Sequence, residues 1–497
     1  AGHATGGWWH GGIGWYRLPS VLCAVVASVL TWVFGRSMWR RRGVAGEIGA
    51  WVAGASLGAC VMVLWDGRQA RADQLLLLCT VAAMLGLWWS WCGSAAVGRR
   101  RAGFWSLALM WGGVAAGVLA KGPITPMVVF GAVVMIGVLT GRWRWAGRLG
   151  WLGGLGFVGL GVGAWVFFVA REVGFGVYAG IVWEEVFVRS GRAAEGHWGP
   201  PGYHLVLLPV LFWPGSLLTA AAVVWMLSRR SGRVVGSGRV RRYASGMAAR
   251  IRGRGAWAVF VVAWAVPGWV VFEASSTKLP HYTLPLYPAI ALVTGRFVGA
   301  LVCGEARVPG DVGARLGFGL WAVIGVLVTG GTGVFLSVAA DGPLGWSVIG
   351  GAVSGGVLML GAVALLKGGR ALPVTAAGLA AAAIASATVW GVVLPRLEGV
   401  WISSRVAGVL SAAGVDGSVP LVMSGYREDS LVFLSDGRAE ALGLGGVPAW
   451  AAAHPGGVAL MEVPASVEVP AQGVIGEVLG VNYNVGGWER VPVLEAG

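Results

Sequence analysis

Long apolar stretches follow one another along most of the chain, and short polar connectors separate them. Between Leu18 and Leu394 there are twelve apolar runs, each long enough to cross a lipid bilayer as a helix. Many Gly and Ala residues lie within these runs, which favours close helix–helix packing in lipid. The pattern predicts a polytopic α-helical membrane protein. The twelve runs are 18–34, 48–64, 75–92, 102–120, 123–139, 149–169, 205–227, 256–272, 282–302, 316–338, 345–366 and 372–394.

The pattern changes after Leu394. A helical stretch at Val400–Ala413 precedes short apolar segments at 419–423, 439–444 and 457–463. Alternation of this kind predicts a small α/β domain. We therefore expect a transmembrane domain over 1–394 and an α/β domain over 395–497. The second domain carries no glycine-rich phosphate fingerprint, no metal-ligand cluster and no nucleophile elbow.

The charged residues orient the expected helices in the membrane. The formal net charge is +15, yet only 12% of the residues are charged. Every second connector is rich in arginine, and one of them holds nine arginines between Arg229 and Arg254. By the positive-inside rule these connectors face the cytoplasm, so the excess charge indicates topology and not nucleic-acid binding. The chain is thus expected to be a multi-pass protein of the bacterial inner membrane.

The other connectors and the C-terminal domain would then face the periplasm. The five cysteines all fall inside apolar runs without metal-ligand spacing, and we interpret them as buried apolar side chains. The sequence predicts no cofactor, and it leaves open whether a divalent metal is needed, because the visible acids are few and scattered.

The connector within Phe272–Pro288 reads FEASSTKLPHYTLPLYP and carries an unusual concentration of polar side chains. Lys278, His281 and Tyr282 lie in it beside several hydroxyl groups, and three prolines break regular helix and fix the backbone. A cation, an imidazole and hydroxyls held rigidly at a membrane face suit a phosphate or sugar ligand. The alternative is a polar loop with interfacial Tyr and Lys anchors.

Two further outer connectors hold charged residues. In WDGRQARADQLLLL, Asp66 and Asp73 bracket Arg68 and Arg71, and Asp73 stands directly before an apolar run. Asp73 can be simply a helix N-terminal partner, but paired acids and arginines at a membrane face also fit a site for a base or a bound cation. In AKGP, Lys121 stands in a turn between two spans, where lysine is costly unless it snorkels or pairs with an anion such as a lipid phosphate.

The longest outer connector, 170–204, combines an amphipathic helical pattern with a rigid aromatic turn. Trp183, Val186 and Phe187 recur at helical spacing, with charged residues at the other positions, so we expect an interfacial helix. The turn EGHWGPPGYH follows and presents His197 and Tyr203, residue types that stack on sugars.

Taken together, these stretches resemble the polyprenyl-phosphate-dependent glycosyltransferases of the GT-C class, in the superfamily of the bacterial aminoarabinose transferases and protein O-mannosyltransferases. STKLPHYTLPLYPAIAL is the most specific motif, and the resemblance extends over essentially the whole chain. The other matching stretches are WYRLPS, GRQARADQLLLL, AKGP, EGHWGPPGYH, FWPGSLL, SGYREDSLVFL and GVNYNVGGW.

This resemblance implies inverting transfer of a sugar from a polyprenyl-phosphate donor to a lipid or glycan acceptor, or less readily to protein hydroxyls, at the outer face of the membrane. It implies that Lys121 and Lys278 hold the carrier phosphate, with Arg71 and Arg192 as helpers, and that Asp73 is a site acid. His197, Tyr203, His281 and Tyr282 would line the sugar or the acceptor.

Such enzymes begin with a further helix and an outer loop that bears the presumed general base, and this sequence starts after those elements. The base is therefore expected in a segment that is not part of this sequence. Two other functions stay open: a transporter or flippase for a lipid-linked sugar, and a catalytically incomplete homologue that binds the carrier lipid. The sequence does not specify which sugar or acceptor is used.

Overall fold

The computed structural model describes most of the chain, in two compact units. One unit comprises Ala1–Val328 with Ser354–Ala383, and the other comprises Thr329–Val353 with Ile384–Gly497. The expected domain boundary at 394/395 stays a prediction. The described residues are 13–92, 101–183, 199–228, 239–307, 320–321, 323–331, 334, 345, 348–357, 371–426, 428–464, 466, 473–482 and 487–495.

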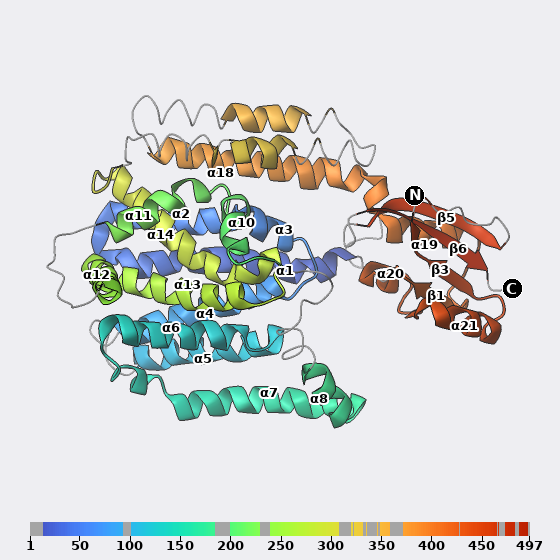
Figure 1. Cartoon of the computed structure of the whole chain (residues 1–497), viewed down its shortest axis with the longest axis horizontal. Helices are drawn as coiled ribbons and strands as arrows, with labels where there is room; N and C mark the ends of the chain where they lie inside the picture. Colours follow the sequence, from blue (N-terminus) through green and yellow to red (C-terminus); the bar gives the residue numbers. More distant parts are fainter. Residues whose placement is uncertain are drawn as a thin grey trace. The chain divides into compact units, whose positions relative to one another are not determined.

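The first unit is a bundle of helices. Figure 1 shows α4, α5, α6, α13 and α14 with their axes roughly parallel or antiparallel, while α12 is seen end-on. Its described α-helices are α1 (Ile13–Trp39), α2 (Gly43–Gly58), α3 (Val61–Asp66), α4 (Asp73–Cys92), α5 (Arg101–Lys121), α6 (Ile124–Thr140), α7 (Trp151–Val173), α8 (Phe175–Trp183), α10 (Tyr203–Leu211), α11 (Ser216–Leu227), α12 (Arg239–Arg254), α13 (Ala256–Ala274) and α14 (Tyr287–Val302).

Seven candidate membrane spans occur among the described residues, judged by length and apolar composition. They are Gly14–Gly58, Asp73–Cys92, Gly103–Lys121, Trp151–Val173, Ala256–Ala274, Pro280–Val302 and Thr375–Arg396. Shorter apolar helices occupy Ile124–Thr140, Ser216–Leu227 and Val348–Val357. The expected class of polytopic α-helical membrane protein is confirmed, whereas the number of twelve spans stays a prediction.

Three expected element boundaries were wrong. The run 205–227 is not one helix, because α10 ends at Leu211 and α11 begins at Ser216. Pro214, which lacks a backbone N–H, lies within this break. The run 48–64 is likewise divided, since α2 ends at Gly58 and α3 begins at Val61. The run 18–34 begins later than its helix, because α1 starts at Ile13.

Small residues allow the close packing of α2 against α14. A Cβ placed on Gly295 would lie 2.2 Å from the carbonyl oxygen of Gly49, and one on Gly299 would lie 2.0 Å from that of Ala45. Neither separation is possible between real atoms, so these positions require glycine. The Gly and Ala content of the apolar runs therefore serves backbone contact, as the sequence pattern predicted.

The second unit contains a six-stranded sheet with the order β2-β1-β3-β6-β4, and β5 pairs with β6. Strands β2, β1 and β3 are parallel, and β6 is antiparallel to β3, β4 and β5. Helix α18 (Ala371–Thr388) leads into this unit. Its other elements are α19 (Ile402–Ala412), β1 (Leu421–Ser424), α20 (Asp429–Leu434), β2 (Ala439–Ala441), α21 (Val447–Ala453), β3 (Val458–Met461), β4 (Val463–Pro464), β5 (Val474–Asn482) and β6 (Gly487–Glu495).

The sequence predicted the first half of this unit and not the second. Helix α19 and strands β1, β2 and β3 fall within the segments expected to be helical or apolar. The β5–β6 pair was not predicted, because its alternation is interrupted by Gly476, Gly480 and Pro492. Val491 and Val493 of β6 are nonetheless fully buried in the core beneath α19.

Candidate functional site

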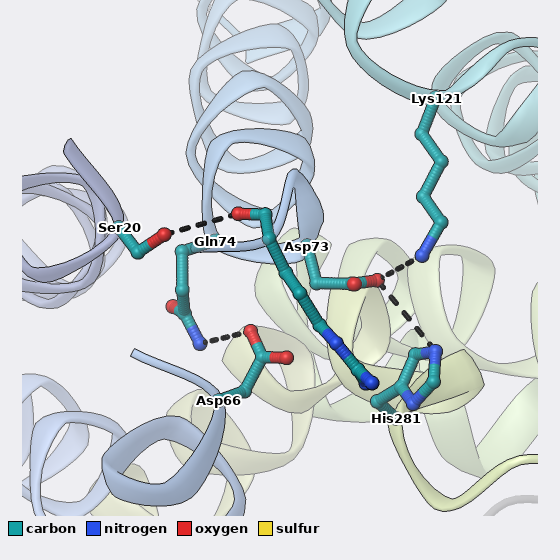
Figure 2. A network of polar contacts seen from close by, with 7 residues as sticks. Ser20, Asp66, Asp73, Gln74, Lys121 and His281 are labelled. Carbon is teal, nitrogen blue, oxygen red and sulfur yellow. Dashed lines mark hydrogen bonds and ion pairs between the residues drawn. The ribbon is translucent and has the colours of Figure 1, made fainter. Parts of the chain in front are cut away.

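Three side chains from different parts of the sequence meet at one end of the bundle. Asp73 is the first residue of α4, Lys121 is the last residue of α5, and His281 lies in the 3₁₀ helix η6 (Pro280–Leu286). Asp73 Oδ1 accepts a hydrogen bond from Lys121 Nζ and lies 3.9 Å from His281 Nε2 (Figure 2). Asp73 is almost completely buried, whereas a third of the Lys121 side chain is exposed. The ammonium group is therefore accessible to a ligand.

Local sequence fixes the positions of these groups. Helix α5 ends at Lys121 because Gly122 adopts a left-handed conformation, with φ of 67°, and Pro123 follows it. The cation thus lies at a helix C-terminus, and the acid lies at the N-terminus of α4; both arrangements are favourable for the helix dipole. Pro280 and Pro285 keep His281 in a tight 3₁₀ turn, as the proline spacing predicted.

A second acid lies beside this group. Asp66, the last residue of α3, is 1% exposed, and its Oδ2 accepts a hydrogen bond from Gln74 Nε2 at 2.8 Å (Figure 2). Asp66 Oδ1 and Gln74 Oε1 are also buried, and neither has a hydrogen-bond partner among the described residues. Burial, followed by the negative charge of Asp73, raises the pKa of Asp66 to about 6. The sequence pairs Asp66 with Asp73 around the arginines of this connector, but it did not indicate Gln74 or the burial of either side chain, because that burial depends on the packing of α3 against α4.

The loop between these acids is tied to the first helix. Ser20 Oγ of α1 donates a hydrogen bond to the carbonyl oxygen of Arg71 at 3.0 Å. Arg71 is exposed, and its charge lowers the pKa of Asp66, acting against burial and Asp73. Arg71 therefore contributes positive potential to the same end of the bundle.

A second polar group lies nearby, where α10 meets α13. The carboxylate of Glu273 accepts hydrogen bonds from the backbone N–H groups of Gly202, at 2.9 Å, and His204, at 3.1 Å. His204 is buried, and its Nε2 is 3.2 Å from the carbonyl oxygen of Leu279. Burial lowers the pKa of His204 below its usual value, although Leu279 and Glu273 act in the opposite direction. Glu273 thus holds the start of α10 in place.

The structure buries Lys278 within this second group. Its residue exposure is 5%, and its Nζ donates a hydrogen bond to the carbonyl oxygen of Ser275 at 2.5 Å. A Cβ on Gly199 would lie 2.9 Å from Lys278 Cδ, so the turn that begins at 199 packs directly on the lysine stem. Among the described residues no carboxylate lies within ion-pair distance of Lys278, which leaves its charge available to an anion.

The aromatic residues expected to line a sugar lie at the same end. The ring of Tyr203 is perpendicular to that of His204 at 5.1 Å, and the ring of Tyr282 is perpendicular to that of His281 at 5.2 Å. Arg192 and His197 lie outside the described residues, as does most of the expected interfacial helix. The structure therefore brings together Arg71, Asp73, Lys121, Tyr203, Lys278, His281 and Tyr282, and their roles stay predictions.

No metal site is defined by the described part of the chain. Within it, no group of three or more His, Cys, Asp or Glu side chains is placed to hold a metal ion. The polar chemistry described above consists of cations, carboxylates, imidazoles and tyrosine rings, a set suited to an anionic ligand that also carries hydroxyl groups.

Comparison with known proteins finds relatives among sugar transferases. No family model matches the chain. The undecaprenyl phosphate-α-4-amino-4-deoxy-L-arabinose arabinosyl transferase 2 of Sodalis glossinidius is 27% identical over 307 residues, which are 61% of this chain and 48% of that protein. The corresponding transferase of Erwinia tasmaniensis is 23% identical over 316 residues, 63% of this chain and 51% of that protein. The chain spans about half the length of the curated relatives it matches.

Two crystal structures of ArnT from Cupriavidus metallidurans have the same fold. The structure bound to undecaprenyl phosphate matches with a TM-score of 0.68 and 16% identity, over 97% of this chain and 84% of ArnT. The apo structure matches with a TM-score of 0.68 and 17% identity, over 97% and 83%. The chain therefore has the fold of ArnT and is similar in sequence to the undecaprenyl-phosphate aminoarabinose transferases, which confirms the resemblance to the GT-C class that its motifs predicted.

Proposed function

We propose that this protein is a membrane glycosyltransferase that moves a sugar from a polyprenyl-phosphate carrier to an acceptor in the bacterial envelope. The relatives are named as arabinosyl transferases that use an undecaprenyl phosphate-linked aminoarabinose, which favours an amino-pentose donor. We favour a glycolipid such as lipid A as the acceptor. No observation on this chain favours mannose transfer or a protein acceptor.

The observation that carries this proposal is the convergence of cations on one end of the bundle. Lys121, Lys278 and Arg71 come from three separate connectors, and two of them lack a carboxylate partner among the described residues. The leaving group of the transfer is a lipid phosphate, whose negative charge increases as the sugar departs. Fixed positive groups at a water-poor site stabilise such developing charge more than the ground state.

The remaining side chains have distinct roles in this proposal. Asp73 orients the Lys121 ammonium group, because the two are hydrogen-bonded. His281 lies against Asp73, and together with Tyr203 and Tyr282 it would line the sugar or the acceptor. Arg192 and His197 keep the helper and lining roles that the family resemblance implies for them.

The charge distribution supports a location of this site at the outer face of the inner membrane. The arginine-rich connectors include the region of α12, which lies at the opposite end of α13 from Glu273. With the arginines in the cytoplasm, the site and the C-terminal domain would face the periplasm. A lipid-linked donor and a glycolipid acceptor would both reach it from the outer leaflet.

The test is sugar transfer by Lys121→Met and Lys278→Met variants in membranes supplied with a polyprenyl-phosphate aminoarabinose donor and lipid A. Each substitution removes the charge and keeps most of the side-chain volume. We expect each to lower the transfer rate by about 10²–10³-fold, the usual loss on removing one electrostatic stabiliser.

The matched control is Arg36→Ala, which removes an exposed cation paired with Glu47 at the other end of α1, and it should leave the rate unchanged. Full transfer by both lysine variants would contradict the phosphate assignment. Movement of the lipid-linked sugar between leaflets by the unmodified protein, without covalent transfer, would favour the flippase alternative.

A further inference from the structure

The buried carboxyl group of Asp66 has fewer polar partners than an ionised carboxylate needs. Asp66 is buried at the end of α3, and within the described part of the chain its carboxylate receives one hydrogen bond, from Gln74, while Oδ1 has no partner. Gln74 is itself fully buried, and its Oε1 likewise has no partner among those residues. An ionised carboxylate is costly to bury unless its oxygens accept hydrogen bonds or pair with a cation. The surroundings of Asp66 therefore favour the neutral carboxyl group over the ionised carboxylate.

Asp66 also lies near another acid that is better supported. Asp73 pairs with Lys121, whereas no cation lies within ion-pair distance of Asp66 among the described residues. Figure 2 shows both carboxyl groups within the same polar network. When two acids share a small site, the less supported one holds its proton to higher pH.

We propose that Asp66 is a positioning residue that takes up a proton when a lipid phosphate binds, and so sets the net charge of the site. This inference rests on the proposed function for the identity of the anion. With Asp66 ionised, its charge offsets part of the positive charge of Arg71, Lys121 and Lys278. With Asp66 neutral, the site carries one more positive charge, and a phosphate monoanion restores the balance that the ionised acid gave.

The proton balance of this step is simple. Binding of the phosphodiester anion brings a negative charge near Asp66, and one proton moves from solvent to its carboxylate. Release of the lipid returns that proton. Burial and the charge of Asp73 place the pKa of Asp66 at about 6 before binding, and the added anion raises that pKa further. Affinity for the phosphodiester should therefore fall as the pH rises through this range.

Other titratable groups near Asp66 could produce a similar pH dependence of binding, so their contributions are measured separately. Gln74 and Asp73 come from α4, Arg68 and Arg71 from the loop that follows α3, and Lys121 from α5. Helix α3 also packs against η6 and α10, which carry His281, Tyr203 and His204. A histidine that gains a proton at low pH would strengthen anion binding with the same sign, so His281→Gln and His204→Gln are measured in parallel.

The experiment measures binding of a short-chain prenyl methyl phosphodiester to the full-length chain in lipid nanodiscs between pH 5.5 and 8. A diester is used because a phosphate monoester itself titrates near pH 6. The neutral prenyl alcohol serves as the ligand control. Wild-type affinity for the diester should fall about tenfold across this range, the effect of a one-unit increase in pKa on binding, and affinity for the alcohol should not change.

Two substitutions make the assignment specific. Asp66→Asn should abolish the pH dependence and bind the diester about tenfold more tightly than wild type at pH 7.5. Gln74→Met removes the hydrogen bond that favours the ionised form, so it should move the midpoint of the pH dependence upward. A merely structural role for either residue would not shift a midpoint.

The inference fails if Asp66→Asn keeps the wild-type pH dependence, or if the neutral alcohol shows the same dependence. It also fails if calorimetry in buffers of different ionisation enthalpy detects no proton uptake when the wild-type protein binds the diester near pH 6.5. Absence of sugar transfer by the wild-type protein would contradict the proposed function instead, because the binding measurement does not depend on turnover.

Discussion

The two ends of the helical unit both bury charged side chains, but they satisfy those charges differently. At the end formed by the start of α13 and the end of α14, Arg296 is 3% exposed in its side chain, and its Nη2 donates a hydrogen bond to Glu305 at 2.5 Å, although Nη1 has no acceptor. Trp225 lies between this guanidinium, at 5.8 Å, and that of Arg254, at 4.4 Å. Arg254 also donates hydrogen bonds to the last carbonyl groups of α11.

The opposite end leaves more of its charge available. Among the described residues, Lys278 pairs with a carbonyl oxygen and not with an acid, and the buried oxygen Oδ1 of Asp66 has no partner. The Lys121 side chain remains one-third exposed. Aromatic rings and helix C-termini hold the cations at the arginine end within the fold itself. The comparison teaches that the two ends differ in charge pairing: Arg296 has an acid partner, whereas Lys278 has none among the described residues.

The strongest way to break this comparison is Asp73→Asn at the incompletely partnered end. The substitution keeps the shape but weakens the hold on Lys121, so sugar transfer should fall about 100-fold. The melting temperature in detergent should change little, because Lys121 is partly exposed and can turn to solvent. A large loss of stability with normal transfer per folded molecule would show that the Asp73–Lys121 pair is structural.

Glu273→Gln tests an acid that lies at the site end but is well partnered. Its carboxylate accepts hydrogen bonds from two backbone N–H groups. In the glutamine variant the amide oxygen accepts a weaker bond from one of them, and the amide NH₂ group faces the other N–H, which then has no acceptor. We expect a loss of about 2 kcal/mol in the free energy of unfolding, measured by denaturant titration in mixed micelles. The rate of sugar transfer should fall less than in Asp73→Asn. An unchanged free energy of unfolding would show that the two hydrogen bonds of Glu273 do not stabilise the fold.

Glu305→Gln tests the arginine end and should have the smallest effect. Glu305 is 38% exposed, so solvent screening reduces the value of its pairing with Arg296. We expect a loss of about 1 kcal/mol in unfolding free energy, with the transfer rate per folded molecule unchanged. Arg254→Lys at the same end is the companion variant. A selective loss of transfer in Glu305→Gln would mean that both ends contribute to the reaction.

Membrane class, the small-residue contacts and most candidate site residues were determined by the sequence itself. Runs of apolar residues report the cost of exposing backbone polar groups to lipid, which is a property of local composition. Proline and glycine punctuation around Lys121 and His281 likewise acts locally, so the turns that present these side chains were predictable. The motif STKLPHYTLPLYPAIAL, together with the other matching stretches, predicted the fold that the ArnT structures confirm.

Tertiary structure alone decided which polar groups are satisfied. Asp66, Gln74, Glu273 and His204 appear in the sequence as ordinary polar residues near the ends of apolar runs, and their burial arises when α3, α4, α10 and α13 pack together. The β5–β6 hairpin was missed for a related reason, since long-range strand pairing compensates for its glycines and proline. Hydrogen-bond satisfaction and desolvation depend on neighbours distant in the chain, and these two quantities distinguish the candidate site from the arginine end.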